Sequence, residues 1–342
     1  MKTRIGLIGC GGIAHVHLEG YRRVLAGRAE VTAVADPDPS RRDAFAERYG
    51  IVHRFSSAEA LTASGEVDAV AVLTPPAVRA EAIEPALQRR LPVLVEKPFA
   101  NSLSEAEGYA YAAQEAGVPL AVNQQTRFMP DVQELRRLAS AGALGGLRLI
   151  VHEHYQDRQQ VGGWRAREKR LEISIFSIHL LDRVRWLAGS PPEVVAAWTR
   201  AWNPSVAGET FTIVEIGFES GAIGLVVSSW HSLGVPRCTL RLDGTEGSAE
   251  SRKARLLDDR WTLQVHRLPD SPQRIAGELV RAFPWCMGRS MEELLRAAEA
   301  GEEPVHSAWD NLETMAIVDA AYLSAQREGA PVKIEEVWQR SR

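Results

Sequence analysis

A glycine-rich turn at residues 9–14 constrains the fold of this chain more than any other feature of its sequence. The turn reads Gly-Cys-Gly-Gly-Ile-Ala and lies between an apolar stretch and a helical pattern. In such a strand–turn–helix unit, Gly9 permits the tight turn, Gly11 lets the backbone approach a pyrophosphate, and the final alanine allows close packing. The first helical residues, Gly12 and Ile13, offer free N–H groups to an anion. The turn therefore predicts a dinucleotide site.

An acidic residue at the end of the next apolar stretch supports this interpretation. Asp36 closes residues 30–36, where a carboxylate can accept hydrogen bonds from the ribose hydroxyls of adenosine. The same carboxylate repels a 2′-phosphate, and Asp38 cannot replace the arginine that is usual in NADP sites. Arg41 and Arg42 come one helical turn later and are the residues that could reach such a phosphate. The sequence favours NAD over NADP.

Short apolar strands alternate with amphipathic helices up to about residue 122. This alternation, with strands rich in Val, Ala and Leu, is typical of a doubly wound parallel sheet covered by helices on both faces. The expected strands are 4–9, 30–36, 68–73, 93–96 and 120–122, and the expected helices are 13–26, 40–49, 77–89 and 104–116. Ser104 and Glu107 have the spacing of a capping box, and Gly117 suits the end of that helix.

From residue 123 the pattern changes to that of an antiparallel sheet. Apolar runs follow one another between glycine-containing turns, and three helices are expected among and after them. The runs are 147–155, 194–202, 211–218, 222–230 and 238–242, and the helices are 171–188, 290–300 and 308–327. The 342 residues fit two domains. We expect an α/β protein with a dinucleotide-binding domain at 1–122 and a substrate and oligomerisation domain, built on a large antiparallel sheet, at 123–342.

The composition excludes several classes of protein. With 45% hydrophobic and 25% charged residues the chain is neither disordered nor collagen-like. Forty Lys and Arg against 44 Asp and Glu give a net charge of −4, which argues against a nucleic-acid partner. Cys10, Cys238 and Cys286 are too widely spaced for a disulfide framework or a zinc site. No apolar run is long enough for a bilayer, and the early glycines argue against a signal peptide, so we expect a cytoplasmic protein without a membrane partner.

Further motifs accompany the turn along nearly the whole chain. They are 5–14 with His17, Thr74-Pro75-Pro76, Glu96-Lys97-Pro98, Arg127-Phe128 with Pro130, Gly163-Trp164-Arg165, His179 with Asp182, and Asp310, Ala320-Ala321-Tyr322 and Ser324. With these motifs the chain resembles the Gfo/Idh/MocA oxidoreductases, relatives of glucose–fructose oxidoreductase and inositol dehydrogenase. Glu96-Lys97-Pro98 is the most specific of them, because it accompanies the nucleotide turn.

The resemblance implies an architecture and a set of cofactor residues. It implies a Rossmann domain, an α/β domain on a large, mostly antiparallel sheet whose face mediates dimers or tetramers, and a last helix, here 308–327, that packs on the Rossmann domain. The nicotinamide would lie between the domains, with Thr74, Pro75, Glu96 and Lys97 beside the cofactor. The peptide before Pro98 is often cis in the family.

The chemistry of alcohol oxidation asks for two groups that the resemblance also supplies. Hydride removal from a carbinol requires a base within hydrogen-bond reach of the hydroxyl, and a cation that stabilises the developing negative charge on the oxygen. The resemblance places Lys97 near the nicotinamide in the second role, and His179 fits the first. We expect an NAD(P)-dependent oxidoreductase acting on a sugar, polyol or related small molecule. Two alternatives stay open: elimination or glycoside cleavage through transient oxidation, and a dinucleotide-binding protein without catalysis.

The catalytic helix departs from the pattern of the family. Where the family carries Asp-x-Gly-x-His-x-x-Asp, this chain has Ile175 for the first aspartate and Ser177 for the glycine, while His179 and Asp182 match. Glu172 could take over the missing carboxylate. On a continuous helix it would share the face of His179, roughly 10 Å away along the axis. An ordinary first-turn carboxylate, stabilised by the helix dipole, is the other interpretation of Glu172.

Other polar residues complete the candidate site. Trp164, Arg165 and Asp182 are further candidates for substrate contact. His152 and His154 lie two apart on an expected strand and so face the same side, but no further metal ligands accompany them, and no metal is expected. Arg79 stands where the family often has histidine.

Overall fold

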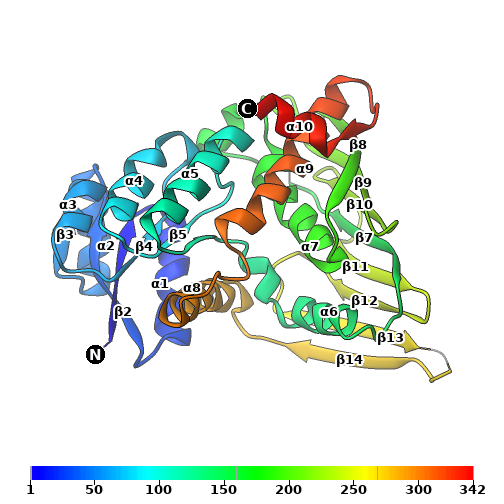
Figure 1. Ribbon diagram of the computed structural model, residues 1–342, viewed down its shortest axis with the longest axis horizontal. Helices are drawn as coiled ribbons and strands as arrows, with labels where there is room; N and C mark the ends of the chain where they lie inside the picture. Colours follow the sequence, from blue (N-terminus) through cyan, green and yellow to red (C-terminus); the bar gives the residue numbers. More distant parts are fainter. Residues whose placement is uncertain (1, 159, 268, 342) are drawn as a thin grey trace. The chain divides into compact units, whose positions relative to one another are not determined.

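The computed structural model describes residues 2–158, 160–267 and 269–341 of the chain. The fold divides into two compact units (Figure 1). The first comprises 1–125 and 283–312, and the second 126–282 and 313–342. The segment 283–312, which the sequence assigned to the second domain, thus groups with the first unit. No described helix has both the length and the apolarity that crossing a bilayer requires.

A parallel sheet forms the centre of the first unit, as predicted. Its strands are β1 (Thr3–Ile8), β2 (Ala29–Ala35), β3 (His53–Phe55), β4 (Ala69–Val72), β5 (Val93–Val95) and β6 (Leu120–Val122). They lie in the order β3-β2-β1-β4-β5-β6, and every pair is parallel. The chain order reverses beside β1, and in doubly wound sheets the nucleotide binds at this point, outside the carboxyl ends of the strands.

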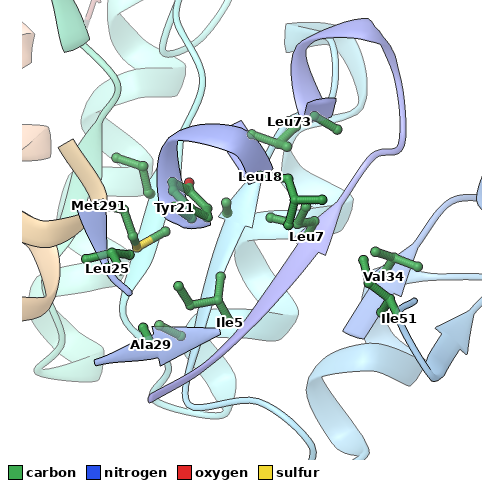
Figure 2. Close-up of a cluster of buried hydrophobic side chains, with 14 of the residues drawn as sticks. Ile5, Leu7, Leu18, Tyr21, Leu25, Ala29, Val34, Ile51, Leu73 and Met291 are labelled. Atoms are coloured by element: carbon green, nitrogen blue, oxygen red, sulfur yellow. The ribbon is translucent and has the colours of Figure 1, made fainter. Parts of the chain in front are cut away.

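Helices surround this sheet. They are α1 (Gly12–Val24), α2 (Pro39–Tyr49), α3 (Ala58–Ala63), η1 (Pro76–Val78), α4 (Ala80–Gln88), α5 (Leu103–Ala116) and α8 (Ala282–Ala300), whose residues from 283 onward belong to this unit. Figure 2 shows side chains of α1 and Met291 of α8 in one buried cluster with those of β1 and β2. The two helices approach closely at Gly20, where a Cβ would stand only 2.0 Å from the carbonyl oxygen of Pro284.

The N-terminus of α5 corrects one sequence prediction. The cap is Ser102, whose hydroxyl accepts from the backbone N–H of Glu105, so the predicted pair of Ser104 and Glu107 is wrong by two residues. The Glu105 carboxylate accepts from the N–H of Asn101 rather than from that of the cap. At the other end, Gly117 takes the left-handed conformation, with φ of 68°, as predicted.

The second unit is built on a larger sheet, which is mostly antiparallel. Its strands are β7 (Leu147–Tyr155), β8 (Pro192–Arg200), β9 (Phe211–Phe218), β10 (Ile223–Ser229), β11 (Arg237–Gly244), β12 (Gly247–Lys253), β13 (Arg260–Arg267), β14 (Gln273–Glu278) and β15 (Val332–Lys333). They lie in the order β14-β13-β12-β11-β7-β10-β9-β8-β15, with β7 and β10 parallel. The predicted fold class is confirmed. The strands β12 to β15 were not predicted, and neither was β3 of the first unit.

Helices pack against this sheet. They are α6 (Pro130–Ser140), α7 (Ile178–Ala188), α9 (Ala308–Gln326) and α10 (Ile334–Ser341), together with the turns η2 (Gln125–Phe128), η3 (Gly163–Arg167) and η4 (Ile173–Ser177). In Figure 1, α6 lies along β12 and β13, and α7 along β7 and β10. The first five residues of α9 belong to the first unit and the rest to the second. The packing of this last long helix on the Rossmann domain stays a prediction.

Candidate active site

The predicted cofactor residues of the first unit follow the carboxyl ends of four neighbouring strands. β2, β1, β4 and β5 are adjacent and parallel in the sheet, so the segments after them emerge at one edge. The residues that these segments carry are Asp36 after β2, Gly9, Gly11, Gly12 and Ile13 after β1, Thr74 and Pro75 after β4, and Glu96 and Lys97 after β5. The topology of this one unit therefore gathers residues that the sequence spreads over its first hundred positions.

The glycine turn has the geometry that a pyrophosphate needs. Gly9 has φ of 103°, and a Cβ there would lie 3.2 Å from the backbone of Leu73, so only glycine fits without strain. At Gly11 and Gly12 a Cβ would meet nothing within 4 Å, so the backbone is open to approach. The N-terminus of α1 has no side-chain cap and no acidic residue in its first turn. These residues fit a bound dinucleotide phosphate.

Asp36 is anchored by backbone groups. One carboxylate oxygen accepts from the N–H of Cys10 at 2.9 Å, and the other accepts from the N–H of Asp38, also at 2.9 Å. Each oxygen keeps a second lone pair for a ribose hydroxyl. The guanidinium of Arg41 lies 3.7 Å from Asp36 and 3.5 Å from Asp38, so this arginine turns back toward the carboxylates.

Glu96 lies in a buried hydrogen-bond network. Its Oε1 accepts from His17 Nε2 at 2.8 Å and from the Asn123 side chain at 2.6 Å, and the Tyr21 hydroxyl lies 2.8 Å from the other nitrogen of His17. Although burial alone raises the pKa of Glu96, the hydrogen bond and charge of His17 and the charge of Lys97 lower it overall. Glu96 is therefore an ionised anchor for the turn that presents Lys97.

The turn after β5 also has the expected backbone form. The Lys97–Pro98 peptide is cis, as the resemblance implied. Lys97 is half-buried beside the anchored glutamate. Lys97 belongs to the first unit, and His179 belongs to the second.

A buried arginine supports the segment after β4. Arg79 is 1% exposed and donates from Nη2 to the carbonyl of Thr74 at 2.8 Å. Burial lowers its pKa to about 10, against the charge of Glu96, which raises it, so the guanidinium remains a cation at neutral pH. Arg79 thus fixes the backbone of Thr74, a role that the sequence did not reveal.

In the second unit, the helix that carries His179 begins with a π-helical turn. The sequence predicted one continuous helix over 171–188, but Ile173–Ser177 is π-helical and the α-helix starts at Ile178. His179 lies in the first turn of α7 and is 5% exposed. π-Helical turns often occur at functional sites, because they shift the side chains that follow.

Ile175 occupies an apolar environment. It forms a cluster with Leu171 and Trp230, and Trp164 and Phe176 pack against this cluster. A carboxylate at position 175 would be desolvated here. The apolar side chains around position 175 therefore suit isoleucine better than the aspartate of the family pattern.

Asp182 is fully buried in an ion pair. Its two oxygens accept from Arg127 Nε and Nη2 at 2.7 and 2.6 Å, and Oδ1 also accepts from the Thr314 hydroxyl at 2.9 Å. Both side chains of the ion pair have 0% exposure. The geometry gives Asp182 the role of holding α7 in place, whereas the sequence predicted contact with substrate.

Glu172 is also fully buried. Its Oε1 accepts from the Ser177 hydroxyl at 2.6 Å, across the π-helical turn. Burial raises its pKa to about 7, against hydrogen bonding from Ser177 and the hydroxyls of Ser228 and Thr212. The separation of Glu172 and His179 that was expected for a regular helix does not apply here. The carboxyl stabilises the π-helical turn through Ser177 and does not face a ligand.

The remaining sequence candidates lie around this helix. Trp164 is half-buried on the apolar cluster of Ile175, and Arg165 is exposed, with its guanidinium 5.0 Å from the Trp164 ring centre. The sequence missed Glu209, which caps the π-helical turn by accepting from the N–H groups of Leu171 and Ile173. The sequence around the helix gives no sign of this capping role, because Glu209 comes from a distant loop and does not directly precede the helix.

His152 and His154 are buried and point to the same side of β7. His152 donates to the carbonyl of Thr239 at 2.9 Å, and burial, with the charge of Arg183, lowers its pKa well below the ordinary value. Burial lowers the pKa of His154 to about 4, and its ring lies 4.6 Å from that of Phe176. Across the described residues, no three His, Cys, Asp or Glu side chains are grouped as metal ligands.

Comparisons with known proteins agree with this geometry. Residues 3–124 match the oxidoreductase family with an NAD-binding Rossmann fold, and residues 132–250 match the GFO/IDH/MocA C-terminal domain. D-apiose dehydrogenase of Paraburkholderia graminis is 30% identical over 97% of this chain and 89% of its own length. D-xylose 1-dehydrogenase (NADP+) 2 of Haloferax volcanii is 28% identical over 96% of this chain and 99% of its own.

A solved structure is similar over almost the whole chain. It is an oxidoreductase from Agrobacterium radiobacter in complex with NAD+, L-tartaric acid and magnesium, 26% identical, with a TM-score of 0.90 and coverage of 98% and 99% of the two chains. Fold and nucleotide turn together define an oxidoreductase with an NAD-binding Rossmann domain. Within that class, the chain belongs to the Gfo/Idh/MocA family, as its motifs predicted.

Proposed function

We propose that this chain is a cytoplasmic NAD-dependent dehydrogenase that transfers hydride between nicotinamide and a carbinol of a sugar or polyol. The observation that carries the proposal is the turn after β5, where buried Glu96, held by His17 and Asn123, presents Lys97 at the sheet edge that also holds the glycine turn. The similar D-apiose and D-xylose dehydrogenases act on sugars. The first unit would bind the dinucleotide and the second the substrate.

The proposed mechanism divides the work between two side chains. When bound, NAD supplies the acceptor for the hydride that leaves the carbinol carbon. His179 Nε2 or Nδ1 takes the hydroxyl proton as the carbonyl forms. Lys97 donates a charge-assisted hydrogen bond to the same oxygen and stabilises its developing negative charge. The buried pair of Asp182 and Arg127 positions the helix that carries His179.

A panel of sugars and polyols, each with NAD or NADP, tests the proposal through the near-ultraviolet absorbance of the reduced nicotinamide. We expect Lys97→Ala to lower turnover about 10²- to 10³-fold and His179→Ala about 10²- to 10⁴-fold. The exposed residues Lys2 and His266 offer matched alanine controls. Bond cleavage without net reduction of NAD would mean transient oxidation, and NAD binding without any turnover would mean a binding protein.

NAD, rather than NADP, is the cofactor that we propose. The Asp36 carboxylate repels a 2′-phosphate, and Arg41 is directed toward Asp36 and Asp38. Asp36→Asn keeps an acceptor oxygen but removes the charge, so the preference for NAD should narrow by about 1–3 kcal/mol. The ratio of the two dissociation constants, measured by calorimetry, cancels any effect on folding. A wild-type preference for NADP would contradict this assignment.

We further propose that a second copy of this chain covers the open face of the larger sheet. Trp198 and Ile223 on this sheet are 40% and 45% exposed, and exposed charges of both signs, such as Glu215 and Arg241, lie on the same face. In a two-fold interface the same patch of both subunits comes together, so charges of a single sign would repel one another and charges of both signs can pair. Light scattering should give a dimer or tetramer, and Ile223→Arg should weaken it, unlike Val52→Arg in the first unit. A wild-type monomer at micromolar concentration would refute the interface.

A further inference from the structure

Two arginines lie over aromatic rings beside the π-helical turn. The guanidinium carbon of Arg158 is 4.7 Å from the ring centre of Trp230 and 5.8 Å from that of Phe176. That of Arg165 is 5.0 Å from the ring centre of Trp164. All five residues belong to the second unit, and we call them the arginine–aromatic cluster. The aromatic members pack on Ile175, so the cluster lies where the family carries its first aspartate.

The described residues place no carboxylate within ion-pair distance of either arginine of this cluster. Within the described part of the chain, Arg158 and Arg165 form no ion pair within 4 Å, whereas Arg127, Arg137 and Arg185 of the same unit all do. Burial, and then the like charge of Arg165, lower the pKa of Arg158, against the charge of Glu172. Two cations near each other without a countercharge form a site that an anion would stabilise.

The groups around the cluster do not supply that countercharge. Glu172 directs its carboxyl to Ser177, and its raised pKa of about 7 leaves much of it neutral at physiological pH. His154, whose ring contacts Phe176, is neutral because burial lowers its pKa to about 4. Ile175 is apolar. The helix that carries the proposed base thus has positive charge and aromatic surface beside it.

We propose that the arginine–aromatic cluster binds the carboxylate of a sugar acid, so that the substrate is a uronate or aldonate rather than a neutral sugar. This inference rests on the proposed function, because it assigns the substrate class of the same site. A guanidinium matches a carboxylate with two parallel hydrogen bonds. The C–H face of a sugar packs on aromatic rings, which also keep the arginines in place.

The position of His179 agrees with this assignment. It follows Ile175 by four residues and Phe176 by three, and it lies in the first turn of α7, directly after the π-helical turn that carries these two members of the site. A sugar acid held by its carboxylate at the cluster could present a carbinol to the histidine. The reaction itself is unchanged: hydride leaves the carbinol carbon for NAD, and the hydroxyl proton goes to His179.

Matched substrate pairs test the inference. We compare kcat/KM with NAD within three pairs of an acid and a neutral compound: glucuronate and glucose, galacturonate and galactose, and gluconate and sorbitol. We expect at least a roughly tenfold preference for the acids. Arg158→Gln and Arg165→Gln should each lower that preference about 10- to 100-fold, mainly through a higher KM for the acid. Arg167→Gln is the matched control, because Arg167 is an exposed arginine in the same turn as Arg165.

The outcomes separate this inference from the proposed function. Oxidation of neutral sugars without a preference for acids, unaffected by Arg158→Gln, would overturn the sugar-acid assignment and leave the dehydrogenase in place. If neither class is oxidised, the dehydrogenase itself fails. Calorimetric titration of glucuronate and of glucose into the protein with NAD then measures binding without turnover. Binding of glucuronate but not of glucose, lost in Arg158→Gln, would support the carboxylate site. Absence of glucuronate binding would overturn it.

Discussion

Replacement of the buried carboxyl Glu172 by glutamine should make the stability of this protein less dependent on pH. Glu172 has 0% exposure, and its Oε1 accepts from Ser177. Glutamine keeps that acceptor. Its amide group would also offer N–H donors to the hydroxyl oxygens of Thr212 and Ser228, which face the native carboxyl. The substitution Glu172→Gln therefore removes the titration while preserving the packing of the turn.

The sign and size follow from the raised pKa. Burial raises the pKa of the Glu172 carboxyl from 4.5 to about 7. Between these two pH values the folded state therefore keeps a proton that the unfolded state has already lost. The stabilisation by this proton is complete below about pH 4.5 and disappears as the pH rises to about 7. A shift of this size corresponds to about 3 kcal/mol. Glu172→Gln should then be more stable than wild type above pH 7, by up to about 3 kcal/mol, with the difference shrinking toward pH 5.

Urea unfolding followed by tryptophan fluorescence measures this difference. Seven of the nine tryptophans lie in the second unit, so the signal reports on the surroundings of Glu172. His152 and His154 are common to both proteins, and their own pH dependence cancels in the comparison. Glu168→Gln, at an exposed neighbouring position, controls for loss of a charge. A constant difference between about pH 5 and about pH 8, or a wild type more stable at the higher pH, would refute the reasoning.

Further predictions concern packing and buried charge. Asp182→Asn leaves the buried guanidinium of Arg127 without its countercharge and should cost about 3–5 kcal/mol in urea unfolding; a loss below about 1 kcal/mol would show that the pair is not essential. Gly20→Ala forces a Cβ to 2.0 Å from the Pro284 oxygen and should cost about 1–3 kcal/mol. Gly108→Ala, in an exposed helix position with nothing within 4 Å, should instead stabilise by about 0.5–1 kcal/mol. Equal effects of the two alanines would contradict the packing argument.

The parallel sheet could be predicted because its signals are local. The five predicted strands are short apolar runs that are largely buried, and α2 and α5 begin at a capping side chain and end at a left-handed glycine. The edge strand β3, His-Arg-Phe, has no such pattern and was not predicted. The strands β12 and β14 gave no such signal. β12 reads Gly-Ser-Ala-Glu-Ser-Arg-Lys, and β14 is exposed along nearly its whole length at the edge of the sheet. Such strands form because neighbouring strands provide backbone partners, which no local pattern reports.

In the candidate site, the local geometry of the nucleotide turn could be predicted, but the partners of the buried carboxylates could not. Gly9 and Asp36 have the geometry that their positions implied, because the strand–turn–helix unit fixes it. Asp182 and Glu172 were candidates for substrate contact, yet both are buried and hydrogen-bonded within their own unit. A carboxylate in a helical pattern looks the same in sequence whether it faces a ligand or an arginine from another element. Only the partner, here Arg127 or Ser177, decides between the two.

The exchange of the family aspartate for Ile175 alters more than one contact. An acid at this position would lie among Trp230, Leu171 and Trp164, where its charge would be poorly solvated, and it would attract the unpaired Arg158. With isoleucine at this position, the aromatic rings pack on an apolar side chain, and Arg158 has no carboxylate at residue 175 to pair with. The loss of one acceptor for sugar hydroxyls and the gain of a positive site are then two consequences of a single substitution. A substrate that brings its own carboxylate satisfies both.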